Sequence, residues 1–192
     1  MVAYSQPPLG FGLVQDMYVI PAEGGLSTKI THFVHNNVPD TGAVPLQWIG
    51  DATILVSVTV DTPNIGWSYH ICELGLDGKI TRWILSDSMN TYIAAELSPG
   101  GDMIAYIYRR KDPSTTGMGV ATPDGGDKQT ILPELNYQQD GKFYERISWS
   151  PDGSRLGVSS DEWILTVNKD GTEIDTVLVV AGSEWCNLCD WK

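Results

Sequence analysis

Short runs of alternating apolar and polar residues, separated by turns, make up most of this chain. ATILVSVTV, MIAYIY, WILTVN and IDTVLVV are rich in β-branched and aromatic residues, which favours strands. Asp-Gly pairs follow many of these runs, in LDGK, PDGG, SPDG and KDGT, and glycine supplies the positive φ that tight hairpins need. Long helical periodicity is nearly absent. The pattern therefore predicts an all-β chain of hairpins.

The hairpins recur as a unit of four strands. QWIGDATILVSV, ELSPGGDMIAYIY and SWSPDGSRLGVSS each contain an apolar anchor, a turn and a strand, and a second hairpin follows each of them. The anchors lie 49, 52 and 42 residues apart: Trp48, Leu97, Trp149 and Trp191. Four antiparallel strands at a period of about 40–50 residues are typical of a β-propeller blade.

The stretch W-S-P-D-G, at residues 149–153, resembles the hallmark of the TolB-type repeat, a relative of the WD repeats. S-P-G-G at residues 98–101 matches it in part, and Trp48 keeps only the anchor. The resemblance covers essentially the whole chain and implies a β-propeller, a fold that serves many functions. Because such repeats are common in exported proteins, the resemblance also implies a periplasmic or extracellular location.

The two ends of the chain divide one blade between them. MVAYSQ corresponds to a second strand of the repeat and DMYVIPAEGGLSTKIT to the third and fourth, whereas SEWCNLCDWK supplies an innermost strand. We therefore expect one propeller domain over residues 1–192, with about four blades and a closing strand shared between the termini. The predicted blades are residues 1–34 with 183–192, 44–86, 91–133 and 143–180.

Three assemblies fit this division. The ends can meet within one chain as a four-bladed ring, or the terminal strand can complete a blade of a neighbouring copy. The sequence can also be a piece of a longer propeller. Repeats of this family more often come in sixes to eights, which favours the last two. An unpaired strand edge with a buried face promotes pairing in every case, so self-association through the terminal strands is one prediction.

The charge of the chain argues against two classes of partner. Twelve basic and 24 acidic residues give a net charge of −12, which repels the phosphates of nucleic acids and anionic lipid headgroups.

No apolar run approaches the roughly 18 residues that cross a bilayer, so no membrane span is predicted. Nor does the start have the basic and then apolar regions of a secretory signal. Three cysteines are too few for a disulfide framework.

The stretch GWSYHIC resembles a catalytic motif. Its first four residues, 66–69, are similar to the nucleophile elbow of the prolyl oligopeptidase family, whose members carry G-W-S-Y-G-G and an N-terminal propeller. The elbow needs a small residue two positions after the serine, because the strand turns sharply into a helix there. His70 occupies that position, so we interpret Ser68 as part of an ordinary strand. Trp67 and Tyr69, near a long loop, are candidate exposed aromatic residues for binding.

Cysteine and histidine pairs offer a possible metal site. Cys186 and Cys189 form a C-x-x-C, and His32 with His35 forms an H-x-x-H; together they provide the ligands of a tetrahedral zinc site. Ring closure would bring both motifs to the first blade or its edge. Residues three apart on a strand point to opposite faces, however, so the two cysteines would not converge readily. We therefore expect packed free thiols and no cofactor, with zinc or a redox pair as alternatives.

The residue before each anchor is polar: Gln47, Glu96, Ser148 and Asp190. Each lies on a predicted innermost strand, so we expect the four side chains to ring the central channel. Two carboxylates there could hold a cation or polarise a water, although a solvated polar channel is the interpretation we favour. These four residues are the best binding candidates in the sequence.

The function predicted from the sequence is a non-catalytic recognition scaffold that binds a protein or peptide through the channel mouth and loops. This prediction rests on the resemblance and on the lack of a complete catalytic constellation in the sequence. One alternative is the propeller part of an enzyme. It would be the gating domain of a serine peptidase, or a carbohydrate hydrolase or lyase that uses Glu96 and Asp190. Another is a structural subunit that assembles by terminal strand exchange.

Overall fold

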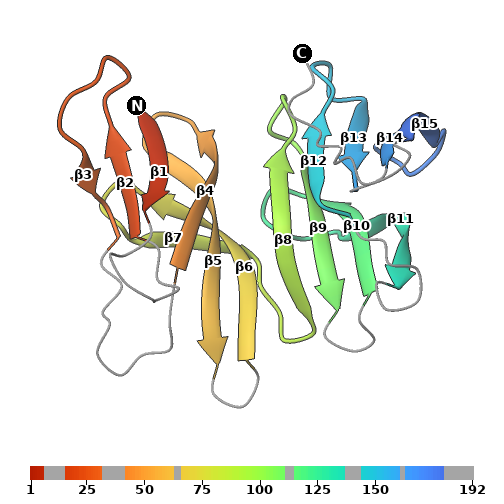
Figure 1. Cartoon of the computed structure of the whole chain (residues 1–192), viewed down its shortest axis with the longest axis horizontal. Helices are drawn as coiled ribbons and strands as arrows, with labels where there is room; N and C mark the ends of the chain where they lie inside the picture. The colour runs from red at the N-terminus through yellow and green to blue at the C-terminus, as the bar shows by residue number, and fades with distance from the viewer. Residues whose placement is uncertain are drawn as a thin grey trace. The chain divides into compact units, whose positions relative to one another are not determined.

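The computed structural model describes residues 1–6, 16–31, 42–62, 66–110, 115–136, 144–160 and 163–179, with only the backbone of residues 6, 61–62 and 66–67. These residues form fifteen β-strands, and none of them lies in a helix. The chain divides into two compact units, residues 1–86 and 87–192 (Figure 1).

The first unit holds two antiparallel sheets in which consecutive strands are neighbours. Its first sheet consists of β1 (Val2–Gln6), β2 (Asp16–Ile20) and β3 (Thr28–Lys29). Its second sheet consists of β4 (Gly42–Ile49), β5 (Thr53–Thr62), β6 (Gly66–Gly75) and β7 (Ile80–Leu85). The alternation along β2 buries Met17 and Val19, which join Ile54 and Val56 of β5 in one hydrophobic core. Burial of each such side chain stabilises the fold by about 1.5–3 kcal/mol.

The second unit holds two further antiparallel sheets of the same order. One consists of β8 (Asn90–Leu97), β9 (Ile104–Arg110), β10 (Thr115–Ala121) and β11 (Gln129–Asn136). The other consists of β12 (Arg146–Trp149), β13 (Arg155–Ser159), β14 (Trp163–Asn168) and β15 (Asp175–Val179). The two sheets share a core to which Ile107 and Met118 contribute from one side and Trp149 and Leu156 from the other.

These sheets confirm the prediction of an all-β fold made of antiparallel sheets within the described ranges. Three sheets have four strands, and the first has three. Its strands correspond to the predicted second, third and fourth strands of the first blade. The stretch SEWCNLCDWK, predicted to supply the missing innermost strand, lies outside the described residues. Ring closure, the number of blades and the single domain therefore stay predictions.

The turns that join third to fourth strands share one geometry. Their aspartates, in the β6–β7, β10–β11 and β14–β15 turns, each accept a hydrogen bond from the backbone N–H two residues further on. The glycine after each aspartate has a φ of 77°, 82° or 84°, a region that disfavours residues with a Cβ. The prediction of hairpins at LDGK, PDGG and KDGT is therefore confirmed.

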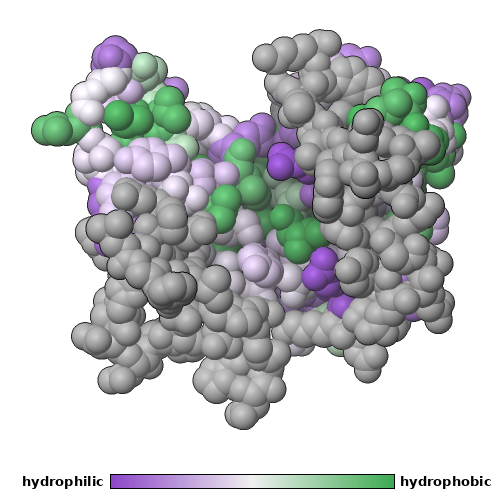
Figure 2. Space-filling view, in the orientation of Figure 1, coloured by the Kyte–Doolittle hydropathy of each residue, from purple (hydrophilic) through white to green (hydrophobic). Residues whose placement is uncertain are grey.

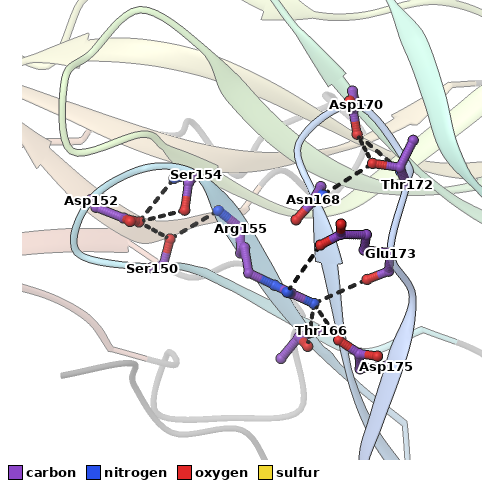
Figure 3. Close-up of polar contacts among 10 residues, drawn as sticks. All are labelled: Ser150, Asp152, Ser154, Arg155, Thr166, Asn168, Asp170, Thr172, Glu173 and Asp175. Carbon is purple, nitrogen blue, oxygen red and sulfur yellow. Dashed lines mark hydrogen bonds and ion pairs between the residues drawn. The ribbon is translucent and has the colours of Figure 1, made fainter.

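The β12–β13 turn carries the W-S-P-D-G stretch (Figure 3). Ser150 Oγ donates to Asp152 Oδ1 at 2.6 Å and accepts the backbone N–H of Arg155 at 2.9 Å. Asp152 also accepts the backbone N–H of Ser154 at 3.0 Å and its hydroxyl at 2.8 Å. The hydrogen bond from Ser150, followed by those from Ser154, lowers the pKa of Asp152 to about 2. The motif is thus a closed set of local hydrogen bonds that fixes the turn.

The β8–β9 turn reaches the same arrangement with a different sequence. Ser98 Oγ donates to Asp102 Oδ1 at 2.7 Å and accepts the backbone N–H of Met103 at 3.1 Å. The aspartate here is four residues after the serine rather than two. Its carboxylate folds back over Gly100, where an added Cβ would lie 3.2 Å from Oδ1. The partial S-P-G-G match therefore forms a turn with the same serine–aspartate bond and the same serine-to-backbone bond as the hallmark turn.

Candidate functional site

Three of the four predicted channel residues lie at equivalent positions on the first strand of a sheet. Gln47 is in β4, Glu96 in β8 and Ser148 in β12, each directly before its anchor. The residues that pair with the anchors are fully buried: Ile54, Ile104 and Leu156. Because successive strand residues point to opposite faces, each polar residue points away from its apolar anchor. Asp190 lies outside the described residues, and the four-residue ring stays a prediction.

The indole of Trp149 connects β12 to β8. Its Nε1 donates a hydrogen bond to the backbone oxygen of Glu96 at 3.0 Å, and the residue is only 3% exposed. A buried indole N–H requires such an acceptor. Strands β8 and β12 lie side by side, so Glu96 and Ser148 are on neighbouring first strands. The repeat pattern identified the anchor as a core residue but did not reveal this bond between sheets.

The candidate aromatic residues differ in their surroundings. Tyr69, in β6, is 39% exposed, as the sequence suggested, and its role in binding stays a prediction. For Trp67 the structure describes only the backbone. Trp83, in β7, is 45% exposed and makes an edge contact with the ring of His70, with centroids 6.0 Å apart. Trp163 packs against the core of the second unit instead.

Ser68 lies in the middle of a strand. Strand β6 runs without interruption from Gly66 to Gly75, so the stretch forms no strand-to-helix elbow, as predicted. The hydroxyl is buried, donates to the backbone oxygen of Val60 at 3.2 Å and lies 2.9 Å from His70 Nε2. The bond to Val60 ties the serine side chain to the neighbouring strand β5, as in an ordinary strand position.

A buried tyrosine links the segments that precede β8 and β11. Tyr92 donates a hydrogen bond to Asp87 Oδ2 and accepts one from Lys128 Nζ at 2.9 Å. Burial, and then the neighbouring Asp87 carboxylate, raises the pKa of Tyr92. The hydroxyl therefore stays protonated and serves as a donor. The sequence held no signal for this cluster, because Tyr92 and Lys128 are 36 residues apart.

Arg155 joins three strands of the last sheet (Figure 3). Its Nη2 donates to Thr166 Oγ1 in β14 at 3.0 Å, to the backbone oxygen of Glu173 at 3.0 Å and to Asp175 Oδ2 in β15 at 2.8 Å. The side chain is 26% exposed, so water screens part of this ion pair. The contacts hold the first residue of β15 against the sheet.

The predicted metal ligands and the cysteine pair are not tested by the structure. His32, His35, Cys186 and Cys189 all lie outside the described residues. Among the residues that are described, no group of three or more His, Cys, Asp or Glu side chains could hold a metal ion. Cys72 is a buried free thiol, and burial raises its pKa to about 12. No helix within the described part is long and apolar enough to span a membrane.

The sequence comparisons give distant relatives. No protein-family model matches the chain. The chain is similar to Protein hir1 of Emericella nidulans, with 26% identity over 154 residues that cover 75% of this chain. It is also 28% identical over 130 residues to Protein hir1 of Aspergillus fumigatus, with 65% of this chain covered. The chain spans only 14% and 12% of the length of these two relatives.

The structural comparisons show the fold. A putative TolB from Agrobacterium tumefaciens matches 92% of this chain and 60% of its own, with a TM-score of 0.65 and 17% identity. One chain of a nidogen/laminin complex matches 89% of this chain over 60% of its own length, with a TM-score of 0.59 and 14% identity. Prolyl oligopeptidase B from Galerina marginata matches 88% of this chain and 23% of its own, with a TM-score of 0.55 and 10% identity. The chain therefore has a TolB-like β-propeller fold.

Proposed function

We propose that this protein is a non-catalytic β-propeller scaffold that binds a protein or peptide through the channel mouth and loops. The observation that carries the proposal is the equivalent register of three polar residues, Gln47, Glu96 and Ser148. In each sheet the anchor pairs with a buried residue of the second strand, whereas the residue before it is polar and lies on the first strand. Within the second unit, Glu96 and Ser148 lie on the neighbouring strands β8 and β12, so one ligand can reach polar groups of two sheets.

The comparisons support a protein as the ligand. One structural neighbour was solved as a complex of nidogen with laminin. A net charge of −12 on this chain repels nucleic acid, which leaves a neutral or basic protein segment as the better electrostatic fit.

A second candidate function is structural. Within the residues that the structure describes, the first sheet has three strands, β1 to β3, where the others have four. We propose that residues 183–192 supply the fourth strand, from the same chain or from a neighbouring copy, within one propeller domain of about four blades. In the second case the protein would assemble through its terminal strands.

The binding proposal is tested by selecting peptides from a displayed library on the full chain and measuring their affinities by calorimetry. We expect Glu96→Gln and Ser148→Ala each to weaken a selected peptide about tenfold, the effect of about 1.4 kcal/mol from a lost buried hydrogen bond. The matched control is Gln129→Ala, an exposed residue on the outer strand β11.

Selected peptides that bind all of these variants equally well would contradict a site at the first strands. Peptides that lose affinity only with Tyr69→Ala would place the binding surface at the β5–β6 loop instead.

A further inference from the structure

Trp149 is connected to both residues of the proposed site in the second unit. It directly follows Ser148 in β12, and its Nε1 donates to the backbone oxygen of Glu96 in β8 at 3.0 Å. The residue is 3% exposed and packs in the core that the two sheets share. Its ring points to the opposite side of β12 from Ser148, because successive strand residues alternate between faces. Trp149 therefore does not contact a ligand that Ser148 binds.

Strand pairing does not align β8 with β12. Each is the first strand of its own sheet, where β8 pairs with β9 and β12 pairs with β13. The two sheets meet through the apolar side chains of their shared core, and such packing is not directional. A hydrogen bond, in contrast, restricts both the distance and the angle between donor and acceptor. The indole N–H of Trp149 therefore sets the position of β12 along β8.

The neighbouring groups at this end of the two strands are apolar. A Cβ added to Gly153 would lie 3.5 Å from Cδ of Pro99, so the turns that follow β8 and β12 are within van der Waals range of each other. Leu97, the anchor of β8, has no hydrogen-bond donor in its side chain. Of the two anchors in the described part of this unit, only Trp149 can therefore make a directional bond between the sheets.

The first strands of this unit offer a ligand polar groups rather than an apolar surface. Figure 2 shows hydrophobic side chains over the outer strand β15, at the upper right. Hydrogen bonds to Glu96 and Ser148 weaken steeply when their angles depart from the ideal. Affinity therefore depends on how these two residues lie relative to each other. The exposed large hydrophobic residues described in the second unit all lie outside β8 and β12: Met89, Ile174, Val177, Leu178 and Val179.

We propose that Trp149 is a positioning residue for the binding site. Its indole N–H holds β12 against β8 at the level where the side chains of Glu96 and Ser148 reach two groups of one ligand. A binding site needs its contact residues held in this way by supporting hydrogen bonds. The role rests on the proposed function, because it requires a ligand that both residues bind.

Trp149→Phe tests the role, because it removes the N–H and keeps an aromatic ring in the core. We expect it to weaken a peptide selected from a displayed library on the full chain about tenfold, as measured by calorimetry. In a Ser148→Ala background the ligand no longer bridges the two strands. The same substitution should then change the affinity by about twofold or less, which is the coupling that a double-mutant cycle detects.

The matched control is Trp163→Phe, which changes another tryptophan that packs against the same core and makes an edge contact with Tyr144. It should leave the affinity unchanged. Urea unfolding and circular dichroism verify that every variant is folded at the temperature of the titrations.

The outcomes separate this role from the proposed function. Unchanged affinity in Trp149→Phe, with affinity lost in Glu96→Gln and Ser148→Ala, overturns the role and leaves the proposed function standing. An equal loss in Trp163→Phe, or a loss that is undiminished in the Ser148→Ala background, shows general loosening of the core and also overturns the role. A library that yields no peptide, or peptides that bind Glu96→Gln and Ser148→Ala as tightly as the unchanged chain, overturns the proposed function and the role together.

Discussion

Two tyrosine rings of β9 lie across glycines of the neighbouring strand β10. A Cβ added to Gly117 would lie 2.4 Å from Cζ of Tyr108, and one added to Gly119 would lie 2.8 Å from Cζ of Tyr106. The hydroxyl of Tyr108 then reaches Glu134 in β11 at 2.8 Å. Each glycine is therefore required by the close approach of a tyrosine ring from the neighbouring strand.

We expect Gly117→Ala to lower the free energy of unfolding by about 1–3 kcal/mol, because the new methyl group displaces a buried ring. Urea unfolding measures the change. In a Tyr108→Ala background the ring is gone, so the penalty of Gly117→Ala should nearly vanish. An equal penalty in both backgrounds would contradict the steric cause.

Cys72 should be inert in the folded protein. It is fully buried in the core of the first unit, and burial raises the pKa of its thiol to about 12. The thiolate is the reactive species, so we expect no alkylation by iodoacetamide at neutral pH until the chain unfolds. Mass spectrometry of the peptide that contains Cys72, before and after urea, measures this. Rapid labelling of the native chain would contradict the buried position.

At the scale of the element, the aspartates of the turns make stability depend on acid pH. The pKa of Asp152 is lowered from 3.8 to about 2, and hydrogen bonds in the folded turns also lower the pKa values of Asp77, Asp102 and Asp170. A carboxylate with a lower pKa when folded stabilises the fold above its unfolded pKa. This stabilisation is lost as the pH falls from about 4 towards 2.

We therefore expect the melting temperature to fall as the pH is lowered from about 4 to 2, and the fall to be shallower in Asp152→Asn. Asparagine keeps the shape of the side chain but does not titrate in this range. Thermal melting at a series of pH values measures both chains. Identical slopes would show that Asp152 does not contribute to the acid sensitivity.

The hairpins could be predicted because their chemistry is local. A turn with Asp and Gly needs only about five consecutive residues, and all of them are visible in the sequence. The hydrogen bond from Trp149 to Glu96 joins residues 53 positions apart. The one from Lys128 to Tyr92 joins residues 36 positions apart. Those pairings depend on how strands align across a sheet or between sheets, which no short pattern records. The same limit applies to the channel candidates. The repeat pattern predicted that they lie on first strands, but a short pattern does not determine whether their side chains meet.

At the scale of the whole molecule, the three-stranded first sheet predicts a dependence on the C-terminal segment. If residues 183–192 pair with β1, their removal exposes the backbone groups of Val2–Gln6. We expect deletion of 183–192 to speed amide exchange in β1, whereas replacing residue 192 alone should not. Light scattering shows whether the same deletion changes the mass of the assembly. Unchanged exchange in β1 would contradict pairing with the terminal segment.

The equivalence of the two Ser-Pro turns has a consequence for how such repeats diverge. Asp152 and Asp102 make the same bond to a serine from positions two residues apart in the motif. A turn with aspartate at both positions would keep the bond to serine if one of the two aspartates were replaced. The position of the aspartate can therefore change between repeats through sequences that all form the turn. The two turns thus share a hydrogen bond rather than a residue at a fixed position. A repeat of this kind can thus lose residues of its sequence motif and still form the turn.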